Sequence, residues 1–115
     1  MSPIIRRGEI YLVDWNPARG SEQKGRRPAL IIQNNIGNEY SATTIVASIS
    51  TKFSKIYPFQ VFLNSKESGL DDDSIIDLAQ IMTISKTRLL RKIGQAKSET
   101  MQLVNEALMH SLNII

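Results

Sequence analysis

The 115-residue chain contains no cysteine, a single histidine (His110) and no long run of apolar residues. The absence of cysteine excludes disulfide bonds and thiol catalysis, and it removes the commonest ligand of zinc. No apolar stretch approaches the ~20 residues that a membrane-spanning helix needs, and the N-terminal residues lack the apolar segment of a secretory signal. These absences predict a cytoplasmic protein with no metal or other cofactor. The length predicts one domain, residues 1–115.

Conventional catalytic motifs are also missing. His110 stands beside the apolar positions of a predicted helix, and no pattern around the serines points to a Ser-His-Asp site, so we interpret it as structural. The acidic run Asp71–Asp73 follows Gly69 but lacks the alternation of a calcium-binding loop, which indicates a solvated turn. There is neither a P-loop nor a dinucleotide-binding fingerprint. Any chemistry must therefore come from cations, hydroxyls and isolated carboxylates.

Basic residues are in modest excess, with 14 Lys and Arg against 11 Asp and Glu. Six cations fall within the first 30 residues, namely Arg6, Arg7, Arg19, Lys24, Arg26 and Arg27. A second group near the C-terminus comprises Lys86, Arg88, Arg91, Lys92 and Lys97. This distribution fits a basic face for a phosphate backbone, but charge alone favours ordinary solvated surface over that interpretation.

The hydrophobic pattern predicts strands first and helices afterwards. Strands are expected over Glu9–Trp15, Pro28–Gln33, Thr43–Ile49, Phe59–Leu63, and Ser74–Ile84 as one bent strand or two short ones. Residues 34–41 suggest a turn or a short helical excursion, and residues 64–73 a loop. Ser85 is expected to cap a short helix that reaches Leu90, and Ser98 a longer helix with apolar positions Met101, Val104, Leu108, Leu112 and Ile115. This order predicts a small, mostly antiparallel, SH3-like β-barrel of the α+β class with a C-terminal helix.

The strongest functional signal is the polar, glycine-punctuated loop between the first two strands. It offers cations, hydroxyls and the carboxylate of Glu22 on a segment held at both ends by a sheet. RNA supplies its own nucleophile, the 2′-hydroxyl, so its cleavage needs only positioning, stabilisation of the charged phosphorus centre and proton transfer. Arginine is suited to stabilising the charged phosphorus centre because its planar guanidinium matches phosphate oxygens, and a carboxylate is suited to proton transfer.

The loop Gly20-Ser21-Glu22-Gln23-Lys24-Gly25, followed by Arg27-Pro28, closely resembles the MazF/PemK family of toxin endoribonucleases. The resemblance implies that Arg27, and not Arg26, is catalytic. It implies a partner hydroxyl from Ser50, where the family usually has threonine, and we assign Glu22 to proton transfer. The implied RNA-binding residues are Ser21, Gln23, Lys24 and Gln80.

The chain departs from close relatives in the stretch that these read as L-E-Q-I-R-T-I. Ala79 replaces the glutamate and Met82 the arginine, which looks like the removal of a charge pair and costs less than leaving one charge unpaired. Specificity, dimer contacts or activity could differ as a result.

The resemblance implies a homodimer that cuts single-stranded RNA without a metal and is neutralised by a small antitoxin with an acidic, flexible tail. Two other hypotheses remain open at this point. One is a gyrase poison of the CcdB type, which shares the barrel but lacks the loop motif. The other is an RNA-binding relic that has lost catalysis.

Overall fold

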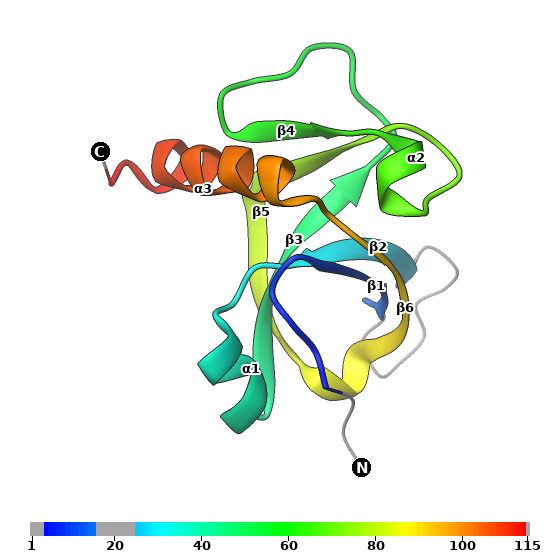
Figure 1. The fold of residues 1–115 in the computed structure, drawn as a ribbon, viewed down its shortest axis with the longest axis vertical. Helices are drawn as coiled ribbons and strands as arrows, with labels where there is room; N and C mark the ends of the chain where they lie inside the picture. Colours follow the sequence, from blue (N-terminus) through cyan, green and yellow to red (C-terminus); the bar gives the residue numbers. More distant parts are fainter. Residues whose placement is uncertain (1–3, 16–24, 115) are drawn as a thin grey trace.

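The computed structural model describes residues 4–15 and 25–114, and its strands form one antiparallel sheet (Figure 1). The strands are β1 (Glu9–Asp14), β2 (Arg26–Ile31), β3 (Thr43–Ser50), β4 (Gln60–Leu63), β5 (Ser74–Ser85) and β6 (Leu89–Gln95), in the order β4-β5-β3-β2-β1-β6. The helices are α1 (Asn35–Tyr40), α2 (Ser65–Ser68), the 3₁₀ turn η2 (Lys86–Arg88) and α3 (Ser98–Leu112). Within the described ranges, no helix is long and apolar enough to cross a membrane.

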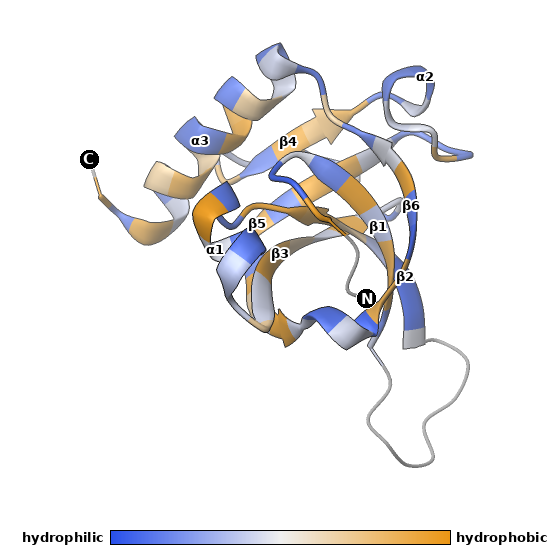
Figure 2. Cartoon of the chain, turned by 60° about the horizontal axis from the view of Figure 1, so that its bottom comes forward, coloured by the Kyte–Doolittle hydropathy of each residue, from blue (hydrophilic) through white to orange (hydrophobic). Residues whose placement is uncertain are grey.

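The sheet is strongly curled, so that its two faces enclose separate hydrophobic cores (Figure 2). Neighbouring residues of one strand alternate between them: Ile10 belongs to the core beneath α3, whereas Tyr11 belongs to the core inside the curl. Leu30 and Ala29 divide in the same way on β2. This period of two is what a strand with both faces covered requires. The predicted barrel-like α+β fold is confirmed.

The longest strand, β5, is continuous but carries a bulge opposite β3. Ala47 lies opposite Ile81, whereas the next residue, Ser48, lies opposite Asp77. Residues 78–80 therefore have no counterpart on β3, and these extra residues bend β5. Of the two forms predicted for this segment, the single bent strand is the one observed.

The short helix predicted after Ser85 ends sooner than expected. Ser85 does cap a turn, since its Oγ atom accepts the backbone N–H of Thr87 at 3.3 Å. Only Lys86–Arg88 are helical, however, and β6 begins at Leu89. Leu89 is buried inside the curl. The prediction was wrong because this tertiary contact overrides the local preference.

The C-terminal helix begins at Ser98, so its N-cap is Lys97 and the predicted cap at Ser98 was wrong by one residue. The cap comes from α2, where Glu67 Oε2 accepts the Lys97 N–H at 2.7 Å and the Thr100 hydroxyl at 2.6 Å. A carboxylate placed there satisfies a free helical N–H and complements the helix dipole.

The buried face of α3 consists of Thr100, Val104 and Ala107, with Met101 and Leu108 partly buried beside it. Ser111 continues this face, since its hydroxyl donates to Leu78 O at 2.8 Å. Leu112, which the predicted apolar positions include, is instead 52% exposed. Ile115 lies outside the described residues. Of the expected apolar positions, Met101, Val104 and Leu108 thus pack against the core, whereas Leu112 faces solvent.

Candidate active site

The candidate site lies where β2 and β3 separate. Their pairing stops at Ala29 opposite Ser48, and Pro28, which has no N–H for a ladder, is the first residue beyond it. Continuing the same register by two residues brings Arg27 opposite Ser50. A pocket of about 720 Å³ opens at this point, and its walls include Arg27, Ser50, Lys52, Asp72, Asp77 and Gln80.

Arg27 has the same strand orientation as Ala29 and Ile31, which are buried inside the curl. The core therefore fixes the backbone of Arg27, while its side chain is exposed at the open end of the strand. Within residues 4–15 and 25–114 its guanidinium has no hydrogen-bond or ion-pair partner. The neighbouring Arg26 points to the other face and is absent from the pocket wall. Arg27 thus presents to the pocket a cation that no described residue pairs.

Ser50 is the last residue of β3 and is half-buried. Its Oγ atom accepts the backbone N–H of Lys52 at 3.0 Å. No acceptor for the hydroxyl proton occurs in the described part of the chain. The bond to Lys52 fixes the oxygen, and the proton remains available for donation to a bound anion.

Gln80 is exposed on the three-residue bulge of β5, and Asp77 stands at the start of that bulge. Asp77 Oδ1 accepts the Ala79 N–H at 3.0 Å, and its Oδ2 accepts Gln60 Nε2 at 3.3 Å. The sequence-based prediction included Gln80 but missed Asp77. One signal was present: Asp77 is the only charged residue between Ser74 and Ile84.

The acidic run has two roles that the expected solvated turn did not include. Asp73 Oδ1 accepts the Ser65 N–H at 2.8 Å, whereas Asp71 and Asp72 line the pocket. The described pocket wall thus combines the cations Arg27 and Lys52 with the carboxylates of Asp71, Asp72 and Asp77. Over residues 4–15 and 25–114, no three histidine or carboxylate side chains are grouped so that they could hold a metal ion.

Four predicted site residues, Ser21, Glu22, Gln23 and Lys24, lie outside the described residues. The stem of their loop is described: the Trp15 N–H donates to Gly25 O, which joins the two ends beyond β1 and β2. Of the remaining predicted residues, the structure brings Arg27, Ser50 and Gln80 into one pocket. His110 is exposed on the last turn of α3 and does not line this pocket.

The fold of this chain is shared with solved structures of mycobacterial endoribonucleases. A solved endoribonuclease from a mycobacterial species matches with a TM-score of 0.80 and 24% identity, covering 97% of this chain and 94% of that one. A mycobacterial endoribonuclease in complex with its cognate antitoxin matches with a TM-score of 0.76 and 25% identity, covering 96% and 97%.

The sequence comparisons identify the family itself. The model of the PemK-like, MazF-like toxins of type II toxin–antitoxin systems matches residues 6–112. Endoribonuclease EndoA of Bacillus subtilis (strain 168) is 47% identical over 113 residues, covering 97% of both chains. The chain therefore belongs to the PemK-like, MazF-like toxin family. The family prediction is confirmed, and with it the predicted class of activity, a toxin endoribonuclease.

Proposed function

We propose that this protein is a sequence-preferring, metal-independent endoribonuclease that cuts single-stranded RNA at the pocket between β2 and β3. The observation that carries this proposal is the placement of Arg27 and Ser50 in one pocket, with neither the guanidinium nor the hydroxyl proton bonded in the described part of the chain. A phosphodiester between these groups would receive a bidentate cation and a hydroxyl donor. The 2′-oxygen attacks phosphorus, and the bond to the 5′-oxygen breaks.

Each group has a separate task in this reaction. Arg27 stabilises the charge that develops on the phosphate oxygens, a contribution of ~10²–10³ in rate for one preorganised donor. The Ser50 hydroxyl donates a hydrogen bond to a phosphate oxygen or to the departing 5′-oxygen. Glu22 accepts the proton of the 2′-hydroxyl. Asp77 is a positioning residue, because its carboxylate holds the bulge on which Gln80 stands.

Selection among RNA sequences requires contacts with base edges, which single-stranded RNA exposes. Gln80 is suited to this, since its side-chain amide carries both donors and acceptors and is exposed at the pocket wall. We assign further contacts to Ser21, Gln23 and Lys24 of the loop. Together these residues would position one short motif across the scissile bond.

The proposal includes two protein partners. One is a second copy of the chain, so that the RNA groove spans a homodimer. The other is a small antitoxin whose acidic, flexible tail orders along the groove and excludes RNA. The mycobacterial endoribonuclease solved in complex with its cognate antitoxin supports the proposal of an antitoxin partner. RNA and antitoxin would meet the protein in the cytoplasm.

A cleavage assay on a long RNA of mixed sequence, in EDTA, tests the proposal. Wild-type protein should give discrete cuts at one recurring motif, mapped by primer extension, and Arg27→Ala should abolish them. Arg26→Ala is the matched control, because it removes the same charge from the adjacent residue outside the pocket. Full cleavage by a folded Arg27→Ala protein would contradict the proposal. So would gyrase-dependent DNA breaks without RNA cuts.

A further inference from the structure

A second pocket, of about 600 Å³, lies at the other end of the β1–β2 pair. Arg27 stands opposite Val13, whereas Gly8, which lines the second pocket, donates its N–H to Ile31 O at 2.8 Å. The walls come from the N-terminal segment, α1, the end of β6 and α3, and they share no residue with the candidate active site. This pocket is therefore separate from the candidate active site.

Arg7 supplies a fixed cation to this pocket. Its Nε atom donates to Ile32 O at 2.8 Å, and one terminal nitrogen donates to Asn105 Oδ1 at 2.8 Å. Both acceptors are neutral, and in the described part of the chain no carboxylate pairs with Arg7. Burial lowers the pKa of this guanidinium, yet arginine remains charged. Arg7 is thus a half-buried charge for which the described residues provide no counter-ion.

The side-chain amides around Arg7 are oriented by it. The Arg7 backbone N–H donates to Asn35 Oδ1 at 2.7 Å, and Asn105 Oδ1 accepts from the guanidinium. Because the Arg7 backbone N–H and guanidinium groups are both donors, the oxygens of the two amides face them. The NH₂ groups of Asn35 and Asn105 have no acceptor among the described residues, so they stay free as donors.

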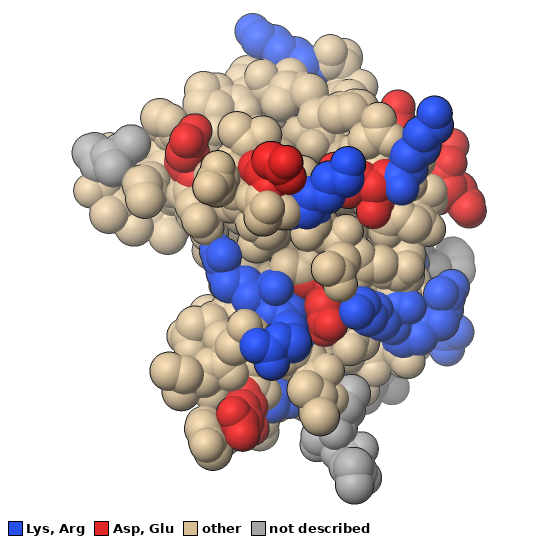
Figure 3. Space-filling view, in the orientation of Figure 1, with Lys and Arg blue, Asp and Glu red and all other residues tan. Residues whose placement is uncertain are grey.

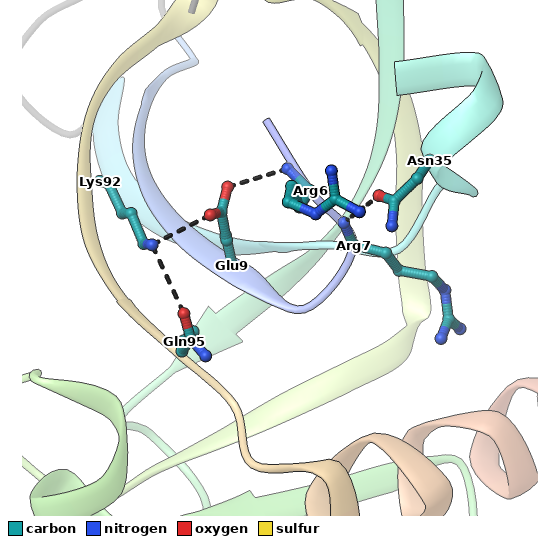
Figure 4. A network of polar contacts seen from close by, with 6 residues as sticks. All are labelled: Arg6, Arg7, Glu9, Asn35, Lys92 and Gln95. Atoms are coloured by element: carbon teal, nitrogen blue, oxygen red, sulfur yellow. Dashed lines mark hydrogen bonds and ion pairs between the residues drawn. The ribbon is translucent and has the colours of Figure 1, made fainter. Parts of the chain in front are cut away.

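The one carboxylate that lines the pocket, Glu9, is already neutralised. Its Oε2 atom pairs with Lys92 Nζ at 2.9 Å, and its Oε1 atom accepts the Arg6 N–H at 2.8 Å (Figure 4). The Arg6 guanidinium has no partner within residues 4–15 and 25–114. Figure 3 shows Lys and Arg atoms gathered across the middle of this face, with an acidic group among them.

We propose that this second pocket binds a phosphate group. Its free donors are the Arg6 guanidinium, the remaining N–H groups of the Arg7 guanidinium and two amide NH₂ groups, whereas the free acceptors on the same wall, from Ser98 and Gln102, are uncharged. These cationic donors fit an oxyanion, and they fit phosphate better than carboxylate because a phosphate group offers more oxygens, arranged in three dimensions, and a phosphate monoester also carries more charge. The volume is that of a pocket for a small ligand. The phosphate belongs either to an RNA strand, beyond the scissile bond, or to a free nucleotide.

Phosphate binding can be followed by NMR, using the Arg7 Nε–H and Asn105 side-chain amide resonances of the full chain. Titration with inorganic phosphate and with adenosine monophosphate should shift these resonances saturably, and sodium acetate at equal ionic strength should not. Arg6→Ala should weaken binding at least ~10-fold, since a hydrogen bond to a charged group is lost. Lys66→Ala, which removes an exposed cation of α2 outside this pocket, is the matched control and should leave binding unchanged.

Three results would overturn the proposal: no saturable shift, acetate binding as tight as phosphate, or equal weakening by Arg6→Ala and Lys66→Ala. A second titration, with single-stranded DNA of increasing length, identifies the source of the phosphate. DNA is used because it lacks the 2′-hydroxyl and is therefore not cut. An affinity gain with length that Arg6→Ala removes assigns the site to a nucleic-acid strand, whereas binding of the mononucleotide alone assigns it to a nucleotide. Neither titration requires RNA cleavage, so failure of the proposed activity would be recognised separately.

Discussion

Asp77 Oδ1 accepts the backbone N–H of Ala79, two residues further along the same strand, at 3.0 Å. This bond lies inside the three residues of β5 that have no counterpart on β3. A carboxylate that bonds to its own backbone in this way replaces a missing ladder bond and stabilises the bulge. Gln80 is the next residue, so its position at the pocket wall depends on Asp77.

Two substitutions separate positioning from proton transfer at Asp77. Asp77→Asn keeps an oxygen for the Ala79 N–H, and we expect cleavage within a few-fold of wild type. Asp77→Ala removes that acceptor, and we expect lower cleavage with altered preference at the base that Gln80 contacts. Rates on a set of RNA substrates that differ at one position measure both effects. If Asp77→Asn instead lost ~10²–10⁴ in rate, Asp77 would be the general base.

Ser50 should tolerate threonine but not alanine. Ser50→Ala removes the hydroxyl donor, and we expect a loss of ~10²–10³ in single-turnover rate. Ser50→Thr keeps the oxygen and adds a methyl group that restricts the rotamer, so activity should be kept or increased. The matched control is Ser48→Ala, which removes another hydroxyl of the same pocket. Equal losses in Ser48→Ala and Ser50→Ala would contradict a specific role for Ser50.

Glu67 should stabilise the protein without affecting its chemistry. Glu67→Ala removes the acceptor of both the Lys97 N–H and the Thr100 hydroxyl, so we expect a loss of about 1–3 kcal/mol in unfolding free energy. Urea denaturation measures this change. Glu106→Ala, at an exposed position of the same helix, is the control and should alter stability little. A stable Glu67→Ala protein would show that water caps α3 equally well.

Ionisation of the Tyr11 phenol should lower the unfolding free energy of the protein at alkaline pH. Burial inside the curl raises the pKa of its phenol, and the nearby Glu9 carboxylate adds to this, while the Lys92 ammonium opposes it. Above the unfolded-chain pKa of about 10, the folded state holds more protons than the unfolded chain, so the unfolding free energy falls as pH rises. Below that pH the contribution is fully present.

Tyr11→Phe should flatten this alkaline decline, because phenylalanine has no proton to lose. Urea denaturation of both proteins from about pH 8 to about pH 11 compares the slopes. Lysine titration is common to the two proteins and cancels in the comparison. Identical slopes would mean that Tyr11 ionises as readily in the folded state as in the unfolded chain.

Much of the candidate site could be predicted from the sequence because its main residues are close in the chain. Arg27 and Pro28 follow the polar loop directly, and a strand period of two decides which arginine shares a face with Ala29. Ser50 was predictable only through the resemblance to the family, since its register with β2 is a long-range pairing. Ala79 and Met82, the two departures, are both exposed. The glutamate and arginine of close relatives would therefore be in contact with solvent at these positions.

The sequence by itself determined strands β1 to β5, the long helix, the family and the identity of the candidate cation, because hydrophobic period and local motif are properties of neighbouring residues. It missed β6, where a helix was expected as far as Leu90. Tertiary structure alone decided that Glu67 caps α3, that Asp77 shapes the pocket wall, and that Arg7 meets Asn105. The contacts of Glu67 and Arg7 join residues 30 or more positions apart, and the bond of Asp77 depends on where the bulge of β5 falls. Such pairings follow from the packing of the whole chain, because many positions carry suitable polar side chains and only the fold selects which of them meet.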